Sequence, residues 1–309
     1  MIVTVTMNPA IDKTVEINTL ERGGLNRIKT AVYDAGGKGV NVSKTIKELG
    51  GKTLATGFLG GNAGRTIDNI LDGLGIETDF VWVDGETRTN TKVFEENGML
   101  TELNEHGCVV PLEKINELMA KLEKLAGEDV LFVLSGSIPA GVSKDIYGEI
   151  TKMAHSKGAA VLLDADGELF RNSIGAIPDI IKPNRVELEE YVGMDDGADD
   201  KELLKIADDF VKKGIKTVAV SMGGDGAIIL HDGIRVKCPV LNVKAHSTVG
   251  AGDAMVAALA YAWENKLSHE ETVKMCMAVS AGAVTTIGTK PPSRELVDEL
   301  MKQVIIENI

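Results

Sequence analysis

The chain of 309 residues is expected to fold as an α/β protein with a mostly parallel central sheet flanked by helices. Two observations predict this class. Short runs rich in Val, Ile and Leu, typical of buried strands, alternate with longer segments whose apolar residues recur at helical spacing. The alternation continues into the C-terminal third without a linker or low-complexity segment. We therefore expect one domain over residues 1–309.

The strands of the main sheet are predicted from their apolar runs. Ile2–Met7 alternates β-branched and polar residues, which is typical of a strand. The other segments expected in this sheet are Thr53–Leu59, Asp129–Leu134, Ala159–Asp164, Thr217–Ser221 and Ala227–Leu230.

Helices are expected between these strands. Lys38–Leu49 follows a pair of glycines, and Asn62–Leu74 ends at Gly75, a residue type that commonly terminates helices. The remaining helical patterns are Pro111–Leu125, Ser143–His155, Asp199–Lys213 and Gly252–Glu264.

Two regions interrupt the alternation with short β patterns. Thr14–Ile17 and Ile28–Tyr33 lie near the first strand, and Thr89–Glu95 and Met99–Asn104 flank Asn97-Gly98, a dipeptide typical of hairpins. We expect a small β-sheet from segments inserted at about residues 13–33 and 88–105. These strands could be ordinary edge strands or a lid over a cleft.

The composition excludes several classes. Acidic residues outnumber basic ones by 46 to 33, and the formal net charge of −13 disfavours a general nucleic-acid binder, which needs a basic surface. No apolar stretch approaches the roughly 18 residues of a membrane span, and the three cysteines have no metal-ligand spacing. We expect a cytoplasmic protein without a nucleic-acid or membrane partner. Glycine is abundant, at 34 residues, and several glycine loops carry candidate sites.

The sharpest candidate site is the segment TVGAGD that begins at Thr248. Glycines let the backbone turn tightly, and a following helix presents unpaired N–H groups that attract anions. Gly250, Ala251 and Gly252 could thus stabilise a phosphoryl group in transfer, and Asp253 could accept a proton from an attacking hydroxyl. The alternative is an N-capping Asp253 after a glycine turn.

A second glycine loop, Ser221-Met222-Gly223-Gly224-Asp225-Gly226, directly follows a predicted strand. It suits a close approach of backbone to nucleotide phosphates, or it is an ordinary hairpin turn. It is no Walker A loop, because the required Gly-Lys-Ser/Thr is absent, and no dinucleotide fingerprint, because a strand follows.

The segment Lys182-Pro183-Asn184-Arg185-Val186-Glu187 combines two possibilities. Asn184 is a good N-cap for the helical run that follows. Asn184 and Glu187 also lie on one helix face, where their oxygen atoms suit Mg²⁺ bound partly through water.

Candidate acceptor-binding residues lie nearer the N-terminus. Gly37 and Lys38 precede a helix that carries Asn41, so the loop offers space, a cation and an amide. Asp12, which follows the first strand, could bind sugar hydroxyls. Arg88 and Asn90 add another cation and amide. Each of these residues alone is more simply a solvated surface or turn residue, and it is their joint presence that favours a binding site.

Together these motifs resemble those of the ribokinase-like (PfkB) carbohydrate kinases, over essentially the whole chain. GGKGVN at 36–41 is similar to the family's N-terminal signature, and TVGAGD at 248–253 is similar to its C-terminal signature. Asn184-x-x-Glu187 resembles the metal-associated motif, and Ser221-x-Gly223-x-x-Gly226 the nucleotide loop. TMNPAID at 6–12 resembles the phosphosugar branch, and within that branch the whole sequence is most similar to the 1-phosphofructokinases.

The resemblance implies a ribokinase-like fold in which the small sheet is a lid, and ATP and Mg²⁺ as cofactors. Asp253 would be the base beside an anion hole at 250–252, and Asn184 and Glu187 would lie near the metal. Lys38 and Arg88 would bind the acceptor phosphate, with Arg27 and Lys92 as additions, and Asp12, Gly37, Asn41 and Asn90 would hold the sugar. ATP would contact Lys182, Asn184, Ser221, Gly223, Gly226, Thr248, Gly250 and Gly252.

The expected reaction is phosphorylation of D-fructose 1-phosphate to fructose 1,6-bisphosphate, with a homodimer formed through the lid. Tagatose 6-phosphate and fructose 6-phosphate are alternative acceptors. A nucleoside or unphosphorylated-sugar kinase would need no pair of cations in the acceptor pocket. A non-catalytic sugar-phosphate sensor could dispense with Asp253, so the presence of the TVGAGD motif argues against it.

Overall fold

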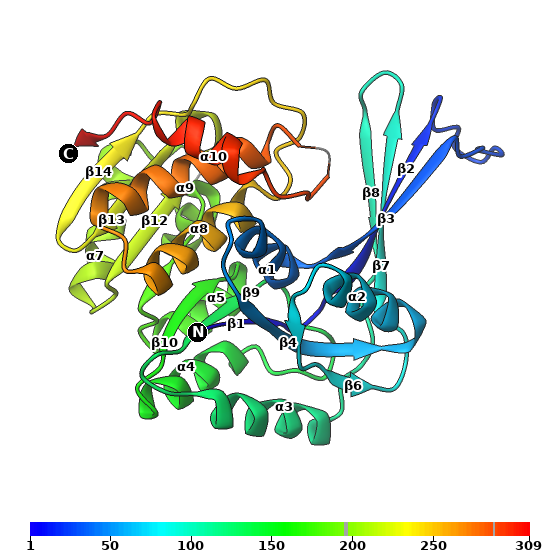
Figure 1. Ribbon diagram of the computed structural model, residues 1–309, viewed down its shortest axis with the longest axis horizontal. Coiled ribbons are helices and arrows are strands. Elements are labelled where there is room, and N and C mark those ends of the chain that lie inside the picture. Colours follow the sequence, from blue (N-terminus) through cyan, green and yellow to red (C-terminus); the bar gives the residue numbers. More distant parts are fainter. Residues whose placement is uncertain (195–196, 287) are drawn as a thin grey trace.

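The computed structural model describes residues 1–194, 197–286 and 288–309, and its largest feature is a long twisted sheet (Figure 1). Most of its strands pair in parallel, and antiparallel strands extend it at one end. In spatial order the strands are β15 (Glu307–Asn308), β14 (Ile234–Cys238), β13 (Ala227–His231), β12 (Thr217–Ser221), β11 (Ile180–Ile181), β10 (Ala160–Asp164), β9 (Leu131–Ser135), β1 (Ile2–Thr6), β4 (Thr53–Gly60) and β5 (Glu77–Thr78), with β6 (Val81–Val83) also paired to β4.

The central strands are buried on both faces, which explains their nearly continuous apolar sequences. All five residues of β1 and of β9 are buried. Side chains alternate between the faces with the strand period of two, so Phe132 and Leu134 enter one core while Leu131 and Val133 enter the other.

Helices cover the two faces and enclose the two cores. The helices α1 (Lys38–Glu48), α8 (Ala251–Asn265), α9 (His269–Ala283) and α10 (Arg294–Met301) pack on one face. The helices α3 (Leu112–Leu125), α4 (Ile146–Ser156), α5 (Gly167–Ile174), α6 (Arg185–Val192) and α7 (Asp200–Lys212) pack on the other. These layers leave the carboxyl ends of the parallel strands accessible, where ligands bind in folds of this class.

A separate four-stranded sheet projects from the body (Figure 1). Its strands, in spatial order, are β3 (Thr30–Gly36), β2 (Ala10–Ile17), β7 (Arg88–Glu95) and β8 (Leu100–Asn104), and β2 and β7 pair in parallel. At its base, Ile11 and Ala35 pack against Ile67 and Leu71 of α2 (Gly61–Gly73). The inserted β-sheet expected from the sequence is therefore present.

The strand and helix limits differ from the sequence expectations mainly at ends. The strand expected at Ile28–Tyr33 lies instead at Thr30–Gly36, because it pairs with β2 from Glu16↔Thr30 to Ala10↔Gly36. The helix expected from Ser143 begins at Ile146, after a turn. Short elements such as β5, β6, β11 and α5 were not expected from the sequence, because they are too short to show a period.

No helix of residues 1–194, 197–286 or 288–309 is long and apolar enough to cross a bilayer.

Candidate active site

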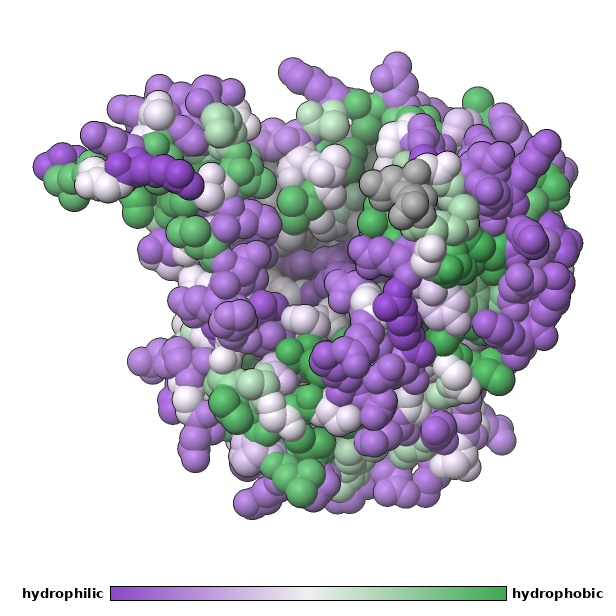
Figure 2. All heavy atoms as spheres, turned by 180° about the vertical axis from the view of Figure 1, so that it is seen from behind, coloured by the Kyte–Doolittle hydropathy of each residue, from purple (hydrophilic) through white to green (hydrophobic). Residues whose placement is uncertain are grey.

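A cleft of about 280 Å³ lies between the carboxyl ends of the central strands and the projecting sheet. Seen from behind, the molecule is hollowed there and the floor is hydrophilic (Figure 2). The cleft brings together seven residues singled out from the sequence: Asp12, Gly37, Lys38, Asn41, Arg88, Asn90 and Asp253. A larger hollow of about 600 Å³ lies near β14 and the start of α9, but none of those residues lines it.

The cleft also contains residues that were not expected from the sequence to bind a ligand. Ser135 ends β9, Gly136 and Ser137 follow it, and Asp166 follows β10. Their places after parallel strands were the signal that could have found them. The others are Thr6, Asn8, Glu102, Asn104, Val249 and Thr289, together with Lys92, which was expected only as an additional cation. Arg27, the other expected addition, is exposed and does not line the cleft.

Asp253 lies in the first turn of α8, directly after a tight glycine turn. Gly250 is the N-cap and has a φ of 87°, in the left-handed region that favours glycine. Asn41 of α1 donates a hydrogen bond from Nδ2 to Asp253 Oδ2 at 2.8 Å. Burial, together with the nearby Asp164 carboxylate, raises the pKa of Asp253 to about 6. This carboxylate is thus better suited to accept a proton than an ordinary Asp.

Two lysines flank the same helix end and share one buried counter-ion. Asp164, at the end of β10, is 1% exposed and lies 3.4 Å from Lys38 Nζ and 3.2 Å from Lys182 Nζ. Burial raises the pKa of Asp164, but the two ammonium groups outweigh it and hold this pKa below its usual value. Burial alone would lower the pKa of Lys38, but the nearby carboxylates of Asp164 and Asp253 raise this pKa above its usual value.

Lys182 lies close to the start of α8. A Cβ built on Gly252 would lie 3.5 Å from Lys182 Nζ, so a side chain at position 252 would occupy the space beside the ammonium. The positive N-terminal end of α8 and two cations therefore lie close together, where an anionic group of a ligand would be stabilised.

Asn184 and Glu187 form a capping box at the start of α6. Asn184 Oδ1 accepts from Glu187 N at 2.9 Å, and Glu187 Oε2 accepts from Asn184 N at 2.8 Å. The N-capping interpretation of Asn184 is thus correct, and it uses one oxygen of each side chain. Burial raises the pKa of Glu187. Within the described ranges, no three His, Cys, Asp or Glu side chains are grouped to hold a metal ion.

The glycine loop 221–226 lies beside this capping box. It joins β12 to β13 as a hairpin, through a short 3₁₀ helix at Gly223–Asp225. Gly226 has a φ of 90°, and a Cβ there would lie 1.9 Å from the Cys238 carbonyl oxygen, so only glycine fits. Ser221 N donates to Pro183 O at 3.0 Å.

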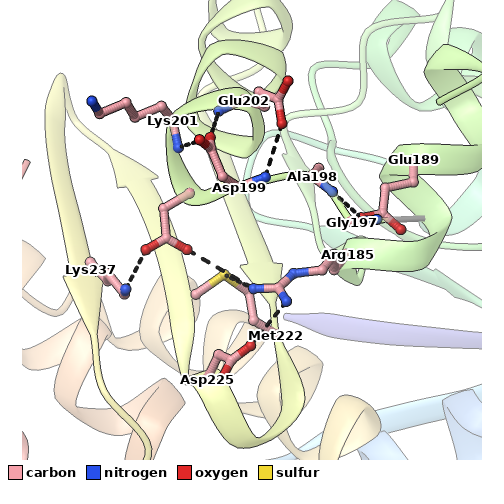
Figure 3. A network of polar contacts seen from close by, with 11 residues as sticks. Arg185, Glu189, Gly197, Ala198, Asp199, Lys201, Glu202, Met222, Asp225 and Lys237 are labelled. Carbon is pink, nitrogen blue, oxygen red and sulfur yellow. Dashed lines mark hydrogen bonds and ion pairs between the residues drawn. The ribbon is translucent and has the colours of Figure 1, made fainter. Parts of the chain in front are cut away.

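An ion pair joins the start of α6 to the glycine loop 221–226 (Figure 3). Arg185 Nη1 lies 2.9 Å from Asp225 Oδ2, and Arg185 Nη2 contacts Met222 Sδ at 3.6 Å. The loop and the start of α6 therefore form one unit. Thr248 is exposed ahead of α8, and its carbonyl accepts from Ala251 N at 3.4 Å.

Several buried polar atoms of the cleft have no hydrogen-bond partner among the described residues. They are Thr6 Oγ1, Asn41 Oδ1, Asn90 Oδ1 and Ser135 Oγ. Buried polar groups are nearly always paired in folded proteins, so a set of unpaired ones in one cleft indicates a ligand. A molecule with several hydroxyl groups could satisfy both the hydroxyls and the amide oxygens.

Arg88 is fixed by backbone carbonyls at the base of the projecting sheet. Its Nε and Nη2 donate to Asn8 O at 3.2 and 2.9 Å, and its Nη1 donates to Glu105 O at 3.3 Å. Its charge still borders the cleft, as the sequence predicts for a residue that binds an anionic acceptor.

Comparisons with known proteins place these features in context. Residues 2–296 match the family model described as "pfkB family carbohydrate kinase". The 1-phosphofructokinase of Vibrio cholerae is 33% identical over 311 residues, covering 98% of this chain and 95% of the relative. A tagatose-6-phosphate kinase of Staphylococcus epidermidis is 31% identical over 306 residues, covering 98% of each chain.

Solved structures agree with the sequence relatives. Phosphofructokinase-2 from Escherichia coli in complex with potassium superposes with a TM-score of 0.92 at 27% identity, covering 98% of each chain. A ribokinase from Thermotoga maritima, at 22% identity and a TM-score of 0.79, shares the fold. The ribokinase-like α/β fold expected from the motifs is therefore confirmed.

Proposed function

Because the chain belongs to the pfkB family of carbohydrate kinases, we propose that it transfers the γ-phosphoryl group of ATP to D-fructose 1-phosphate, giving fructose 1,6-bisphosphate and ADP. The observation that carries this proposal is one cleft in which the buried Asp253 at the start of α8 lies together with Lys38, Arg88 and other polar side chains. The 1-phosphofructokinases among the relatives, at 33% and 34% identity over nearly their whole length, support this acceptor.

In this proposal, Asp253 orients the acceptor hydroxyl and takes its proton. Its burial and its raised pKa support that role, and the hydrogen bond from Asn41 holds the carboxylate in place. The N–H groups at residues 250–252, with Lys38 and Lys182, stabilise the charge on the phosphoryl oxygens during transfer. The loop 221–226 binds the nucleotide from the side of α6.

Mg²⁺ is proposed to arrive with ATP rather than to occupy a site made by the protein alone. When bound, Mg²⁺ neutralises charge on the nucleotide phosphates. No three His, Cys, Asp or Glu side chains are grouped in the described residues, which fits a metal held mostly by phosphates and water. The half-buried Glu187 carboxylate uses Oε2 in the capping box, so its other oxygen supports a role near the metal, with Asn184 beside it.

Glu187→Gln is expected to raise the Mg²⁺ concentration for half-maximal activity by about tenfold. Gln preserves the capping box but removes the charge, so the helix should remain intact. The measurement is a Mg²⁺ titration of the initial rate at saturating substrates. Glu202→Gln is the matched control, because Glu202 has the same place in the capping box of α7. An unchanged titration for Glu187→Gln, or an equal shift in both variants, would contradict a metal role.

An acceptor screen tests the proposed function. ADP release is measured with Mg·ATP and fructose 1-phosphate, tagatose 6-phosphate, fructose 6-phosphate and fructose. We expect the highest kcat/KM for fructose 1-phosphate. A preference for tagatose 6-phosphate, supported by the kinase of Staphylococcus epidermidis, would change the acceptor. Binding of a phosphoketose without turnover would indicate a sugar-phosphate sensor, and no response to any phosphoketose would refute the proposal.

The projecting sheet is proposed to act as the lid of a single domain and as the contact between two copies of the chain. Its outer part exposes four large apolar side chains, Val32, Tyr33, Leu100 and Leu103, between 38% and 60% exposed. Exposed apolar side chains on the two edge strands of a sheet that extends away from the body support burial against a second copy.

Sedimentation is expected to give the mass of two chains for the wild type. A double variant with Val32→Asp and Leu103→Asp puts charges on the outer strands of the sheet and should give the mass of one chain. Leu112→Asp, at a 70% exposed position on α3, is the control and should remain dimeric. A monomeric wild type would refute the dimer.

A further inference from the structure

The cleft contains an ion pair between two residues that both line it, Asp12 and Lys92. Lys92 Nζ lies 3.1 Å from Asp12 Oδ2, and both side chains are 9% exposed. Asn90 Nδ2 donates to the other Asp12 oxygen at 3.5 Å. The carboxylate that the sequence predicts for sugar hydroxyls is therefore already engaged by side chains of β7.

The local backbone fixes this arrangement. β2 and β7 pair in parallel, with Asp12 opposite Asn90 and Thr14 opposite Lys92. The side chains of Asp12, Asn90 and Lys92 therefore share the face toward the cleft. Gly36 of β3 makes room for the carboxylate, since a Cβ there would lie 2.6 Å from Asp12 Cγ. The Asp12 carboxylate thus packs directly against the backbone of Gly36.

Lys92 differs from the other cations of the cleft in what it would give up to bind a phosphate. Arg88 is bonded to backbone carbonyls and keeps them when an anion arrives. Lys38 lies near Asp164 and Asp253, where phosphoryl transfer is proposed. The counter-ion of Lys92 is instead a carboxylate that the sugar itself needs.

We propose that the Lys92–Asp12 ion pair keeps Asp12 from binding sugar hydroxyls until the phosphate group of the acceptor draws Lys92 away. We call this ion pair the lock. The phosphate dianion attracts the ammonium more strongly than one carboxylate does, and Lys92 has three N–H donors with which to bind it. Its departure frees Asp12 to accept hydrogen bonds from sugar hydroxyls. An acceptor without a phosphate must break a buried ion pair and leaves the ammonium uncompensated.

Lys92 would then select phosphorylated acceptors, because it binds the phosphate and also decides whether Asp12 can bind the sugar hydroxyls. This inference rests on the proposed phosphoketose kinase activity. It goes beyond that activity by assigning to Lys92 the discrimination between a ketose phosphate and the free ketose.

The test compares fructose 1-phosphate with fructose in the wild type, Lys92→Met and Lys92→Arg. Lys92→Met should lower kcat/KM for fructose 1-phosphate by about 30-fold or more, mainly through KM, and raise kcat/KM for fructose about threefold. Lys92→Arg keeps the charge and should retain most of the discrimination. An equal loss with both acceptors, or no loss, would overturn the proposal. The KM for ATP and the melting temperature verify that the variants are folded.

A second measurement compares the same proteins with a separate anion. Inorganic phosphite, a small dianion, should open the lock in place of the missing phosphate and stimulate turnover of fructose by the wild type at least severalfold. It should not stimulate Lys92→Met. Absence of stimulation in the wild type, or equal stimulation of Lys92→Met, would overturn the proposal.

The proposed kinase function and the proposed role of the Lys92–Asp12 ion pair can be refuted independently of each other. If the wild type turns over no phosphoketose, the proposed function is wrong. If it turns over fructose 1-phosphate but Lys92→Met leaves the ratio of the two acceptors unchanged, the lock alone is wrong.

Discussion

Asp253→Asn is expected to lower kcat by about 10²–10⁴-fold while the KM for ATP stays within about threefold of the wild type. The amide cannot accept the proton of the attacking hydroxyl, but its oxygen can still accept the hydrogen bond from Asn41. Initial rates with Mg·ATP and the best acceptor of the screen measure the effect. Asp166→Asn, an exposed carboxylate of the same cleft, is the control and should lose less than about tenfold. A loss below tenfold in Asp253→Asn would show that Asp253 is not the base.

The same substitution should also change the pH dependence of stability. The pKa of Asp253 is raised from 3.8 to about 6, so the folded state disfavours the charged form. The resulting destabilisation is absent below pH 4 and fully present above pH 6, and it amounts to roughly 3 kcal/mol. The neutral amide of the variant carries no such penalty. The melting temperature of the variant should exceed that of the wild type at pH 8 and approach it at pH 4. An identical difference at both pH values would contradict the raised pKa.

Lys38→Met is expected to lower kcat by about 10²–10³-fold, because it removes a cation beside the phosphoryl group in transfer. It also leaves Asp164 with Lys182 as its remaining lysine partner. The change in kcat distinguishes two roles of Lys38. A residue that only binds the acceptor phosphate, as expected from the sequence, would raise the acceptor KM and leave kcat unchanged.

Two control variants accompany this measurement. Lys38→Arg keeps the charge in a larger group and should retain more activity than Lys38→Met. Lys47→Met removes an exposed lysine from the same helix, whose ammonium contacts only the Gly75 carbonyl among the hydrogen bonds of the described residues. It should leave kcat and both KM values unchanged. Similar losses in Lys38→Met and Lys47→Met would indicate damage to α1 rather than to the site.

The sequence predicted the fold because the signals that determine it are local. The buried strands β1, β9 and β10 are largely apolar, and the long helices repeat their apolar residues over several turns. The Asn-Gly hairpin signal likewise indicated the pairing of β7 with β8. Elements of two or three residues, such as β5 and β11, depend on neighbours far along the chain, and no local pattern indicates them.

The candidate site was predicted in part for the same reason. Asp253 and Asn41 belong to glycine motifs that are visible in a short window of sequence, and the structure brings them within 2.8 Å. The role of Asp164 could not be predicted, because it follows from the approach of Lys38 and Lys182 from different parts of the chain. The ion pair of Lys92 with Asp12 likewise depends on the parallel pairing of β2 and β7.

The short connection between β1 and β2 has a consequence for assembly. Only Met7, Asn8 and Pro9 separate the last residue of β1 from the first of β2, so one continuous stretch of chain joins the central sheet to the strand that carries Asp12. The proposed contact between copies uses this same small sheet. Sugar binding and self-association would then be thermodynamically linked: any factor by which the acceptor strengthens the dimer is the factor by which dimerisation strengthens acceptor binding.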